Sequence, residues 1–329
     1  MRITLVGCGA LGGLFAARLL AAGEDVQMLQ RPGKRLEDLR RKGLRFREAS
    51  GERSVFFPPL ASSPEELPPA PLVIVAVKAW STSSVAPFMP GLLEKHGWVL
   101  TVQNGLGNAE ILAEKVEERS IVLGPCTYGA RLDSEGSVCA AGEGELLLGP
   151  FRKERDLAPL QALFEHAGFR TILREDPLPL LWEKLILNAA INPLSALARC
   201  SNGDLLASED LRKIMEKLVW EALQVARGEG VALDHQECLE KCFSVCRKTG
   251  SNRNSMLQDV EAKRPTENDA ISGQVVLRGR RRGIPVPCTE DIWHLLRGVD
   301  ALAANRKRSS ACEKTPKKDY PKPLSTPEQ

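Results

Sequence analysis

The residues Gly7-Cys-Gly-Ala-Leu-Gly12 have the Gly-x-Gly-x-x-Gly spacing of a turn that binds the diphosphate of a dinucleotide. A β-branched run precedes this turn at 3–6, and an apolar stretch typical of a helix follows it at 11–22. Backbone N–H groups at the start of such a helix face the phosphates. A glycine-rich strand-to-helix turn without a ligand is the structural alternative. The expected cofactor contacts are Gly7, Cys8, Gly9, Ala10, Leu11 and Gly12.

The end of the second expected strand, 25–30, indicates which dinucleotide binds. An NAD site usually has an acidic residue there, which binds the ribose 2′-hydroxyl. This chain has Gln30 and Arg31 instead. A guanidinium can bind a 2′-phosphate through two parallel hydrogen bonds. We therefore expect NADP(H), with Arg31 at the 2′-phosphate; the alternative is that Arg31 only begins a solvated basic loop.

A second group of polar residues lies on an expected helix over 178–198. Lys184, Asn188 and Asn192 recur every four residues in an otherwise apolar segment, so they share one face. A lysine buried on such a face has a pKa that falls readily. Lysine and two amides would suit a small polar ligand, with the lysine as a proton donor to a carbonyl oxygen. The equally weighted alternative is a lysine that reaches solvent, on a helix that ends at Pro193.

Lys78 follows an expected buried strand at 71–77, and Asn104 follows another at 98–103. The carboxyl ends of parallel strands meet at one edge, where ligands of such sheets bind. One crevice should therefore collect Lys78, Asn104, the glycine-rich turn and Arg31. Further along, Ser255 and Glu267 are explained by the residues alone as a helix N-cap and a first-turn acid.

The sequence predicts two domains that position these residues, an α/β domain and a helical domain. Strands alternate with helices up to about residue 174, which predicts an α/β domain with a Rossmann-type, doubly wound parallel sheet. Within it we expect a strand at 120–124, antiparallel edge strands over 137–149, a helix over 155–167 and a last strand at 169–173.

Helical periods dominate 175–304, which predicts an all-α C-terminal domain. Its expected helices cover 178–198, 208–229, 234–248, 255–281 with an interruption at Thr266, and 288–304. The residues from 305 to 329 are basic, proline-containing and poor in apolar side chains, so we expect a disordered tail there. The run Arg278-Gly-Arg-Arg-Arg282 is expected to be a solvated helix end.

The composition excludes several classes of protein. The chain has 329 residues, 43% of them hydrophobic, and a net charge of +3, which is too small to argue for nucleic acid. The nine cysteines show no paired spacing, which favours reduced thiols in the cytoplasm. Cys238, Cys242 and Cys246 recur every four residues, which suits a partly buried helix face rather than a metal site. We expect no signal peptide, membrane span or metal. The oligomeric state is left open, with a homodimer as one option.

Taken in order and spacing, these strings resemble the ketopantoate reductases (2-dehydropantoate 2-reductases) over roughly residues 1–300. The resemblance rests on residues 7–12, Val77-Lys78-Ala-Trp80, Gln103-Asn104-Gly-Leu-Gly107, Leu181-Trp-Glu-Lys184, Asn188, Ile191-Asn192-Pro-Leu-Ser195, Ser255-Met-Leu-Gln-Asp259, Arg264-Pro-Thr-Glu267 and Gly283-Ile-Pro-Val-Pro287. It implies NADPH-dependent reduction of a 2-oxo acid, with 2-dehydropantoate giving pantoate.

The resemblance also implies roles for individual residues. Lys184 would be the general acid and Glu267 would orient it or the substrate. Asn104 and Lys78 would hold cofactor and substrate, and Arg31 would contact the 2′-phosphate. Asn188, Asn192 and Ser255, with Asn104 and Lys184, would bind the substrate. Two rival hypotheses remain: a reductase of a different 2-oxo acid on the same scaffold, and a non-catalytic NADPH-binding sensor or scaffold that works through its basic tail.

Overall fold

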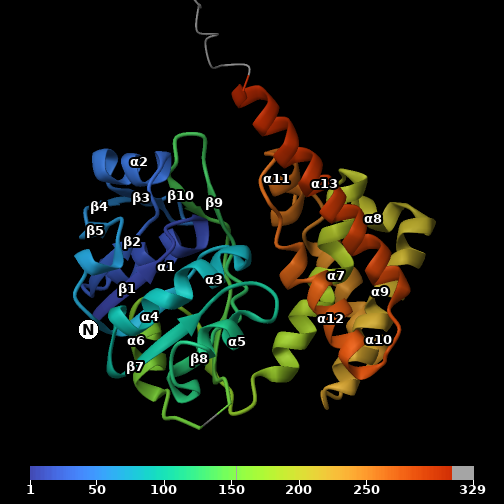
Figure 1. The fold of residues 1–329 in the computed structure, drawn as a ribbon, viewed down its shortest axis with the longest axis horizontal. Helices are drawn as coiled ribbons and strands as arrows, with labels where there is room; N and C mark the ends of the chain where they lie inside the picture. Colours follow the sequence, from blue (N-terminus) through green and yellow to red (C-terminus); the bar gives the residue numbers. More distant parts are fainter. Residues whose placement is uncertain (153, 313–329) are drawn as a thin grey trace, which may run out of the picture.

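The computed structural model describes residues 1–152 and 154–312, with side chains described up to residue 305. Figure 1 shows two parts side by side, one built on a sheet and one made of helices. The sheet part contains all the described strands, the last of which is β12 (Thr171–Leu173), and the helical part begins with α7 (Leu178–Ala198). The expected α/β domain followed by an all-α domain is confirmed.

The main sheet has eight strands in the order β12-β11-β8-β7-β6-β1-β2-β5. All neighbouring pairs are parallel except β11 with β8. The strands are β1 (Arg2–Val6), β2 (Asp25–Leu29), β5 (Leu60–Ala61), β6 (Ala70–Val75), β7 (Leu93–Thr101), β8 (Ile121–Leu123), β11 (Leu146–Pro150) and β12. The direction of the chain therefore brings the ends of β1, β2, β6 and β7 to one edge, where the expected ligand residues follow them.

Both faces of this sheet are covered, because its central strands are apolar on both sides. In β6, Leu72 and Ile74 face a core shared with α1 (Ala10–Ala21) and α6 (Ala158–His166), whereas Val73 and Val75 face the other core. That second core contains residues of α4 (Met89–Leu92) and α5 (Asn108–Ala113). Helices on both faces make the sheet doubly wound.

A second sheet was not expected from the sequence. Its order is β4-β3-β10-β9, with strands β3 (Leu44–Arg47), β4 (Arg53–Phe56), β9 (Ala130–Leu132) and β10 (Val138–Ala140). We expected 137–149 to extend the main sheet, but only β11 does so, while β10 pairs with β3 and β9. Helix α1 packs on this sheet closely: a Cβ on Gly13 would lie 2.5 Å from the Val138 side chain.

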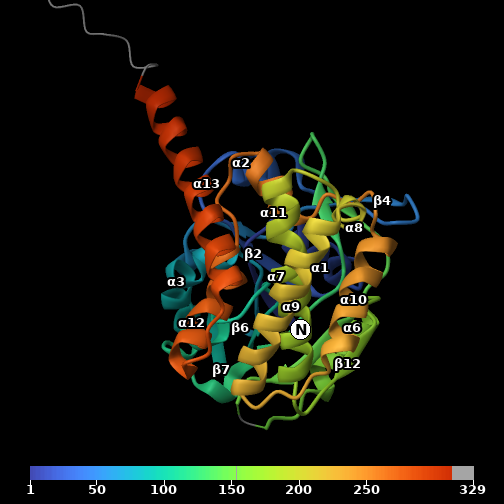
Figure 2. The same cartoon turned by 90° about the vertical axis from the view of Figure 1, so that its right-hand side faces the viewer.

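The helical part is arranged around α7, which contacts α9, α10, α11 and α13. Figure 2 shows these helices in front of the sheet part. Pro193 removes one backbone donor, yet α7 continues to Ala198, so the alternative that it ends at Pro193 is wrong. The other helices are α8 (Asp204–Ala207), α9 (Glu209–Gly228), α10 (His235–Lys248), α11 (Ser255–Glu261), η5 (Asn268–Ala270), α12 (Ser272–Arg282) and α13 (Pro287–Cys312).

Two expectations in this part need correction. The helix expected over 255–281 is three pieces, α11, η5 and α12, and the connecting segment carries Glu267. The last helix does not end at 304: α13 continues to Cys312, so the expected tail cannot begin at 305. The rest of that tail, 313–329, lies outside the described residues.

The expectation for the cysteines agrees with the described part of the chain. Cys238, Cys242 and Cys246 are buried on one face of α10, and all eight cysteines up to Cys288 are free thiols. The described residues contain no cluster of ligands that could hold a metal ion. None of the described helices is long and apolar enough to cross a membrane.

Candidate active site

The turn between β1 and α1 is packed tightly underneath and open above. Gly7 has a left-handed φ of 98°, and a Cβ there would lie 2.7 Å from the Val77 side chain. A Cβ on Gly12 would lie 2.0 Å from the Gly7 carbonyl oxygen. Gly9, by contrast, has nothing within 4 Å of its Cβ position and no side-chain cap on its helix. Open space beside uncapped helical N–H groups fits a diphosphate.

Cys8 contributes to this turn through its backbone. Its N–H donates to Gln30 Oε1 at 2.9 Å, so Gln30 lies where an NAD-binding acid would be expected. Burial raises the pKa of the Cys8 thiol to about 12, against a smaller opposite effect of the Arg35 charge. The thiol therefore stays protonated.

Arg31 is exposed at the end of β2 and lies over the ring of Trp80, with its guanidinium carbon 5.3 Å from the ring centre. It forms no ion pair with any described residue. The neighbouring Arg35, which the sequence analysis missed, donates from Nε to the Cys8 carbonyl at 2.8 Å and from Nη1 to the Gly136 carbonyl at 2.6 Å. Nothing in the spacing of this basic loop distinguishes Arg35 from its neighbours.

Lys78 and Asn104 meet at the carboxyl edge, as expected, and both contact Glu267 from the helical part. Lys78 Nζ lies 3.4 Å from Glu267 Oε2, and Asn104 Nδ2 donates to the same oxygen at 3.4 Å. The other oxygen, Oε1, accepts the backbone N–H of Ala79 at 2.9 Å. Glu267 is therefore a buried bridge between the two parts of the molecule, and not merely a first-turn acid.

Lys184 extends from α7 toward the sheet part, where Nζ donates to the Cys126 carbonyl at 2.6 Å. Burial lowers the pKa of Lys184 below its ordinary value, although the Cys126 thiol and the Glu267 carboxylate act in the opposite direction. Asn188 and Asn192 follow on the same face, and their side chains form no hydrogen bond with any described residue. The stripe therefore presents a half-buried ammonium and two amides without a hydrogen-bond partner among the described residues.

Ser255 is exposed at the first position of α11. It is not the N-cap that its spacing alone suggested: Asn254 caps the helix by accepting the Leu257 N–H at 3.1 Å. Asn254 is itself held by Asn202, 3.1 Å away. The Ser255 hydroxyl is therefore left available for another partner.

Asp259, one turn after Ser255 on α11, belongs to the site although its role was not predicted from the sequence. Its Oδ2 accepts Lys78 Nζ at 2.9 Å, and its Oδ1 accepts Arg264 Nε at 2.8 Å. The four-residue spacing of Ser255 and Asp259 places them on one face and could have indicated a shared site.

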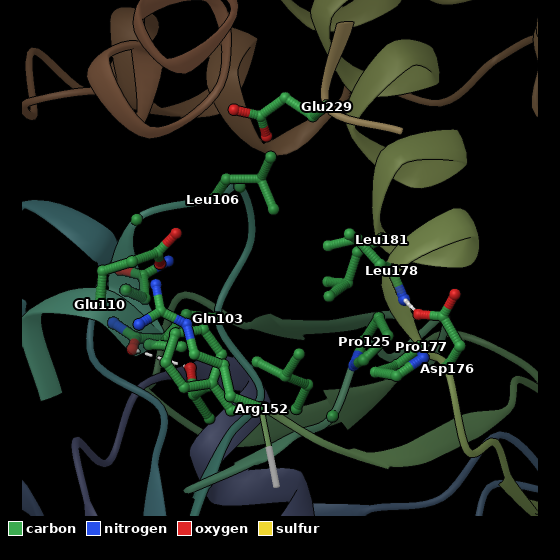
Figure 3. Close-up of a pocket in the computed structure, with 18 of the residues that line it drawn as sticks. Gln103, Leu106, Glu110, Pro125, Arg152, Asp176, Pro177, Leu178, Leu181 and Glu229 are labelled. Atoms are coloured by element: carbon green, nitrogen blue, oxygen red, sulfur yellow. Dashed lines mark hydrogen bonds between the residues drawn. The ribbon is translucent and has the colours of Figure 1, made fainter. Parts of the chain in front are cut away.

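A cavity of about 260 Å³ lies between the two parts, outside this cluster (Figure 3). Leu178 and Leu181 of α7 face Leu106 across it. The loop that carries Leu106 also carries Asn104, so one loop separates the cavity from the site. Neither Lys184 nor Glu267 lines the cavity.

Arg278 lines the same cavity and corrects a further expectation. Instead of being solvated, it donates to Glu110 of α5 at 2.5 Å and to Glu229 at 2.7 Å. Burial opposes the charge, but the two carboxylates outweigh it and raise the pKa of Arg278. In the same run Arg280 pairs with Glu290 at the surface, and Arg281 and Arg282 are exposed as expected.

This arrangement can bring an acid to a bound carbonyl compound. The glycine-rich turn and Arg31 belong to the sheet part, while Lys184, the two asparagines and Ser255 belong to the helical part. Lys78, Asn104 and Glu267 join the two. A ligand held between them would meet a proton donor on one side and a nucleotide site on the other.

Two family models match the chain. "Ketopantoate reductase PanE/ApbA" covers residues 3–153 and "Ketopantoate reductase PanE/ApbA C terminal" covers residues 178–300. The 2-dehydropantoate 2-reductase of Halobacterium salinarum is 36% identical over 300 residues, which are 90% of this chain and 98% of that protein. The 2-dehydropantoate 2-reductase of Archaeoglobus fulgidus is 35% identical over 91% of this chain and 98% of its own length.

Solved structures agree with the sequence matches. A PanE/ApbA family ketopantoate reductase from Ralstonia eutropha has a TM-score of 0.85 at 30% identity, over 92% of this chain and all of that one. A D-mandelate dehydrogenase with NADH and anilino(oxo)acetate has a TM-score of 0.87 over the same shares, and at 23% identity it supports the fold alone. On the family matches and these identities, the chain belongs to the ketopantoate reductase family, whose members are NAD(P)-binding oxidoreductases.

Proposed function

We propose that this protein reduces a 2-oxo acid with NADPH, and that its substrate is 2-dehydropantoate, which becomes pantoate. The observation that carries the proposal is the α7 stripe. Lys184 reaches the sheet part, whose turn fits a dinucleotide diphosphate, and Asn188 and Asn192 on the same helix face have no hydrogen-bond partner among the described residues. The names of the relatives, 2-dehydropantoate 2-reductase, supply the candidate substrate.

The cofactor would be held by the sheet part. The backbone of residues 7–12 would bind the diphosphate. Lys78 and Asn104, at the ends of their strands, would hold cofactor and substrate in the crevice. When bound, the reduced nicotinamide supplies a hydride to the ketone carbon.

Arg31 would give the preference for NADPH over NADH. It is exposed, has no carboxylate partner among the described residues, and follows Gln30 in place of an acid. A 2′-phosphate would meet a guanidinium there, and no carboxylate would repel it.

Lys184 would protonate the ketone oxygen as the hydride arrives. Its lowered pKa makes it a stronger acid than an ordinary lysine, so proton donation in the transition state is easier. The Cys126 carbonyl holds the ammonium by one of its three protons, which leaves two for a substrate and for Glu267. Glu267 would orient Lys184 and favour its charged form, because its carboxylate is one of the groups that raise the lysine pKa.

The substrate would be held by the polar stripe and the start of α11. Asn188 and Asn192 have free amides, which can donate to a carboxylate and accept from a hydroxyl. Ser255, freed from capping by Asn254, and Asn104 would complete the set.

The deciding experiment is steady-state turnover by the purified full chain with 2-dehydropantoate and NADPH, followed by absorbance. A panel of other branched and aromatic 2-oxo acids tests the first rival hypothesis. We expect 2-dehydropantoate to give the highest kcat/KM. A higher value for another acid would reassign the substrate, and NADPH binding without turnover of any acid would favour the non-catalytic sensor.

A further inference from the structure

Lys78 is the point at which three charged groups from different elements meet. Its ammonium leaves the end of β6 and lies between two carboxylates of the helical part, 2.9 Å from Asp259 and 3.4 Å from Glu267. Burial acts to lower the pKa of Lys78, but the carboxylates outweigh it and the pKa is raised. The ammonium is therefore held as a cation across the interface.

Asp259 is held in place by Arg264 of the same part of the molecule, and its position does not depend on Lys78. Its carboxylate is 4% exposed, and its Oδ1 accepts Arg264 Nε at 2.8 Å. The chain turns back at the end of α11 so that the Arg264 N–H donates to the Asp259 carbonyl, also at 2.8 Å. Asp259 is thus the fixed partner, and the longer lysine is the group that reaches it.

Glu267 is shared by three donors, and only one of them is close. One oxygen accepts the Ala79 N–H, while the other is shared by Lys78 and Asn104 at 3.4 Å each. The shorter contact of Lys78 is with Asp259. Without that carboxylate, the nearest anion left to Lys78 would be Glu267, which also contributes to the charge on Lys184.

We propose that Asp259 is a positioning residue, which draws the Lys78 ammonium across the interdomain cleft and so keeps Glu267 available to Lys184. Removing its charge would let Lys78 move onto Glu267 and neutralise it. The two parts of the molecule would also lose one of the ion pairs that join them. The kinetic part of this inference rests on the proposed function, whereas the structural part does not.

The charge balance predicts the direction of a pH effect. Lys184 faces the Cys126 thiol from the loop after β8 and Glu267 from the segment before η5, and both act to raise its pKa against burial. Lys78 faces Glu267 and Asp259, and Asp259 also faces Arg264. If Glu267 pairs with Lys78, its negative charge raises the pKa of Lys184 by less than it does in the wild type. The loss of rate at high pH should then begin at lower pH.

The test compares Asp259→Asn with Asp259→Glu and with Asp291→Asn, an exposed aspartate on α13 that serves as the control for charge removal. For Asp259→Asn we expect kcat to fall by roughly 10–100-fold and the high-pH limb of the kcat profile to move to lower pH. Asp259→Glu should restore part of kcat and should move the high-pH fall of kcat back toward its wild-type pH. Asp291→Asn should leave both unchanged.

Hydrogen exchange of residues 76–82 and of α11, measured without substrate, tests the structural part. We expect faster exchange in both segments for Asp259→Asn than for the wild type and Asp291→Asn. If Asp259→Asn does not fold, Lys78→Met removes the same ion pair from the other side and should give the same faster exchange.

Unchanged exchange in both segments, or a pH profile of Asp259→Asn that matches the wild type, would overturn the inference. A wild type that turns over no 2-oxo acid would instead overturn the proposed function, and the exchange data would still decide the positioning role.

Discussion

At the scale of single residues, the site is defined by how its charged groups are compensated. Lys184 is held by a backbone carbonyl and lies among apolar residues of α7, so its pKa is lowered. Lys78, a lysine of the same site, is held by two carboxylates, so its pKa is raised. The two lysines thus suit different work: Lys184 is ready to give a proton, and Lys78 remains a fixed charge.

Lys184→Ala should lower kcat by about 10²–10⁴-fold, because general acid catalysis contributes an effect of that size. NADPH affinity, measured by fluorescence titration, should be nearly unchanged, since the proposed cofactor contacts lie in the other domain. The control is Lys217→Ala, which removes an exposed lysine from α9. A folded Lys184→Ala protein with near-normal kcat would remove Lys184 from the mechanism.

The lowered pKa of Lys184 also predicts the pH dependence of turnover. A proton donor is active below its pKa, so kcat should fall as pH rises, and the fall should begin below the ordinary lysine range. Glu267→Gln removes one of the groups that raise this pKa, so it should move the limb to still lower pH. Profiles of kcat for both proteins check this; a limb that moves upward in Glu267→Gln would contradict it.

Arg31→Ala should weaken NADPH binding by about 1.5–3 kcal/mol, the usual contribution of a hydrogen bond to a charged group, and leave NADH binding nearly as it was. Titration of both cofactors measures the difference. Arg40→Ala, an exposed arginine of the following helix α2 (Lys34–Lys42), is the matched control. An equal loss in both variants would mean that the basic residues of this segment attract the phosphate only through their overall charge.

At the scale of elements, the features that could be predicted from the sequence are those that a local pattern of residues determines. The helix over 178–198, the glycine-rich turn and the strands that precede Lys78 and Asn104 follow from periodicity and glycine spacing, and the structure has them. The small β4-β3-β10-β9 sheet was missed because β3 and β10 pair across a long separation in sequence, which no local pattern reports. Arg35 was missed for the same reason, because its partner Gly136 lies far away in the chain. The partner of Asp259, Lys78, is also distant, and only the spacing of Asp259 from Ser255 was a local signal.

The turn before α1 offers a matched pair of substitutions. Gly12→Ala would put a Cβ 2.0 Å from the Gly7 carbonyl, so the strand and helix must separate and the protein should unfold at lower temperature. Gly9→Ala has open space and should keep the melting temperature, but its methyl group would occupy the space proposed for the diphosphate and weaken NADPH binding. Thermal denaturation and cofactor titration separate the two effects. A Gly9→Ala protein with wild-type NADPH affinity would place the diphosphate elsewhere.

At the scale of the whole molecule, the two parts are joined on both sides of the loop that carries Asn104 and Leu106. On the site side, Lys78 and Glu267 connect them. On the cavity side, Arg278 links Glu110 and Glu229. Between these, the Leu106 N–H donates to the Ala270 carbonyl at 3.0 Å. The backbone of this loop is therefore bonded to the helical part. The position of the loop depends on the ion pairs of Lys78 and of Arg278 on its two sides.

Arg278→Ala should lower the free energy of unfolding by about 1.5–3 kcal/mol, because it leaves two carboxylates without their shared partner. Arg280→Ala breaks only the surface pair with Glu290 and should cost roughly 0–1 kcal/mol. Urea denaturation measures both. Equal small losses would show that Arg278 is the solvated residue that its sequence context suggested.

The position of β1 in the sheet has a consequence for how the chain is made. This strand lies between β2 and β6, and its residue Ile3 is paired with Val26 on one side and with Leu72 on the other. A ribosome adding ~5–20 residues per second needs several seconds to pass from the first of these partners to the second. Through that interval the growing chain carries the buried side chains of Ile3, Leu5 and Val6 on a strand with one open edge. During synthesis β1 therefore has an unpaired edge, open to wrong pairing with another strand, which β6 closes in the finished fold.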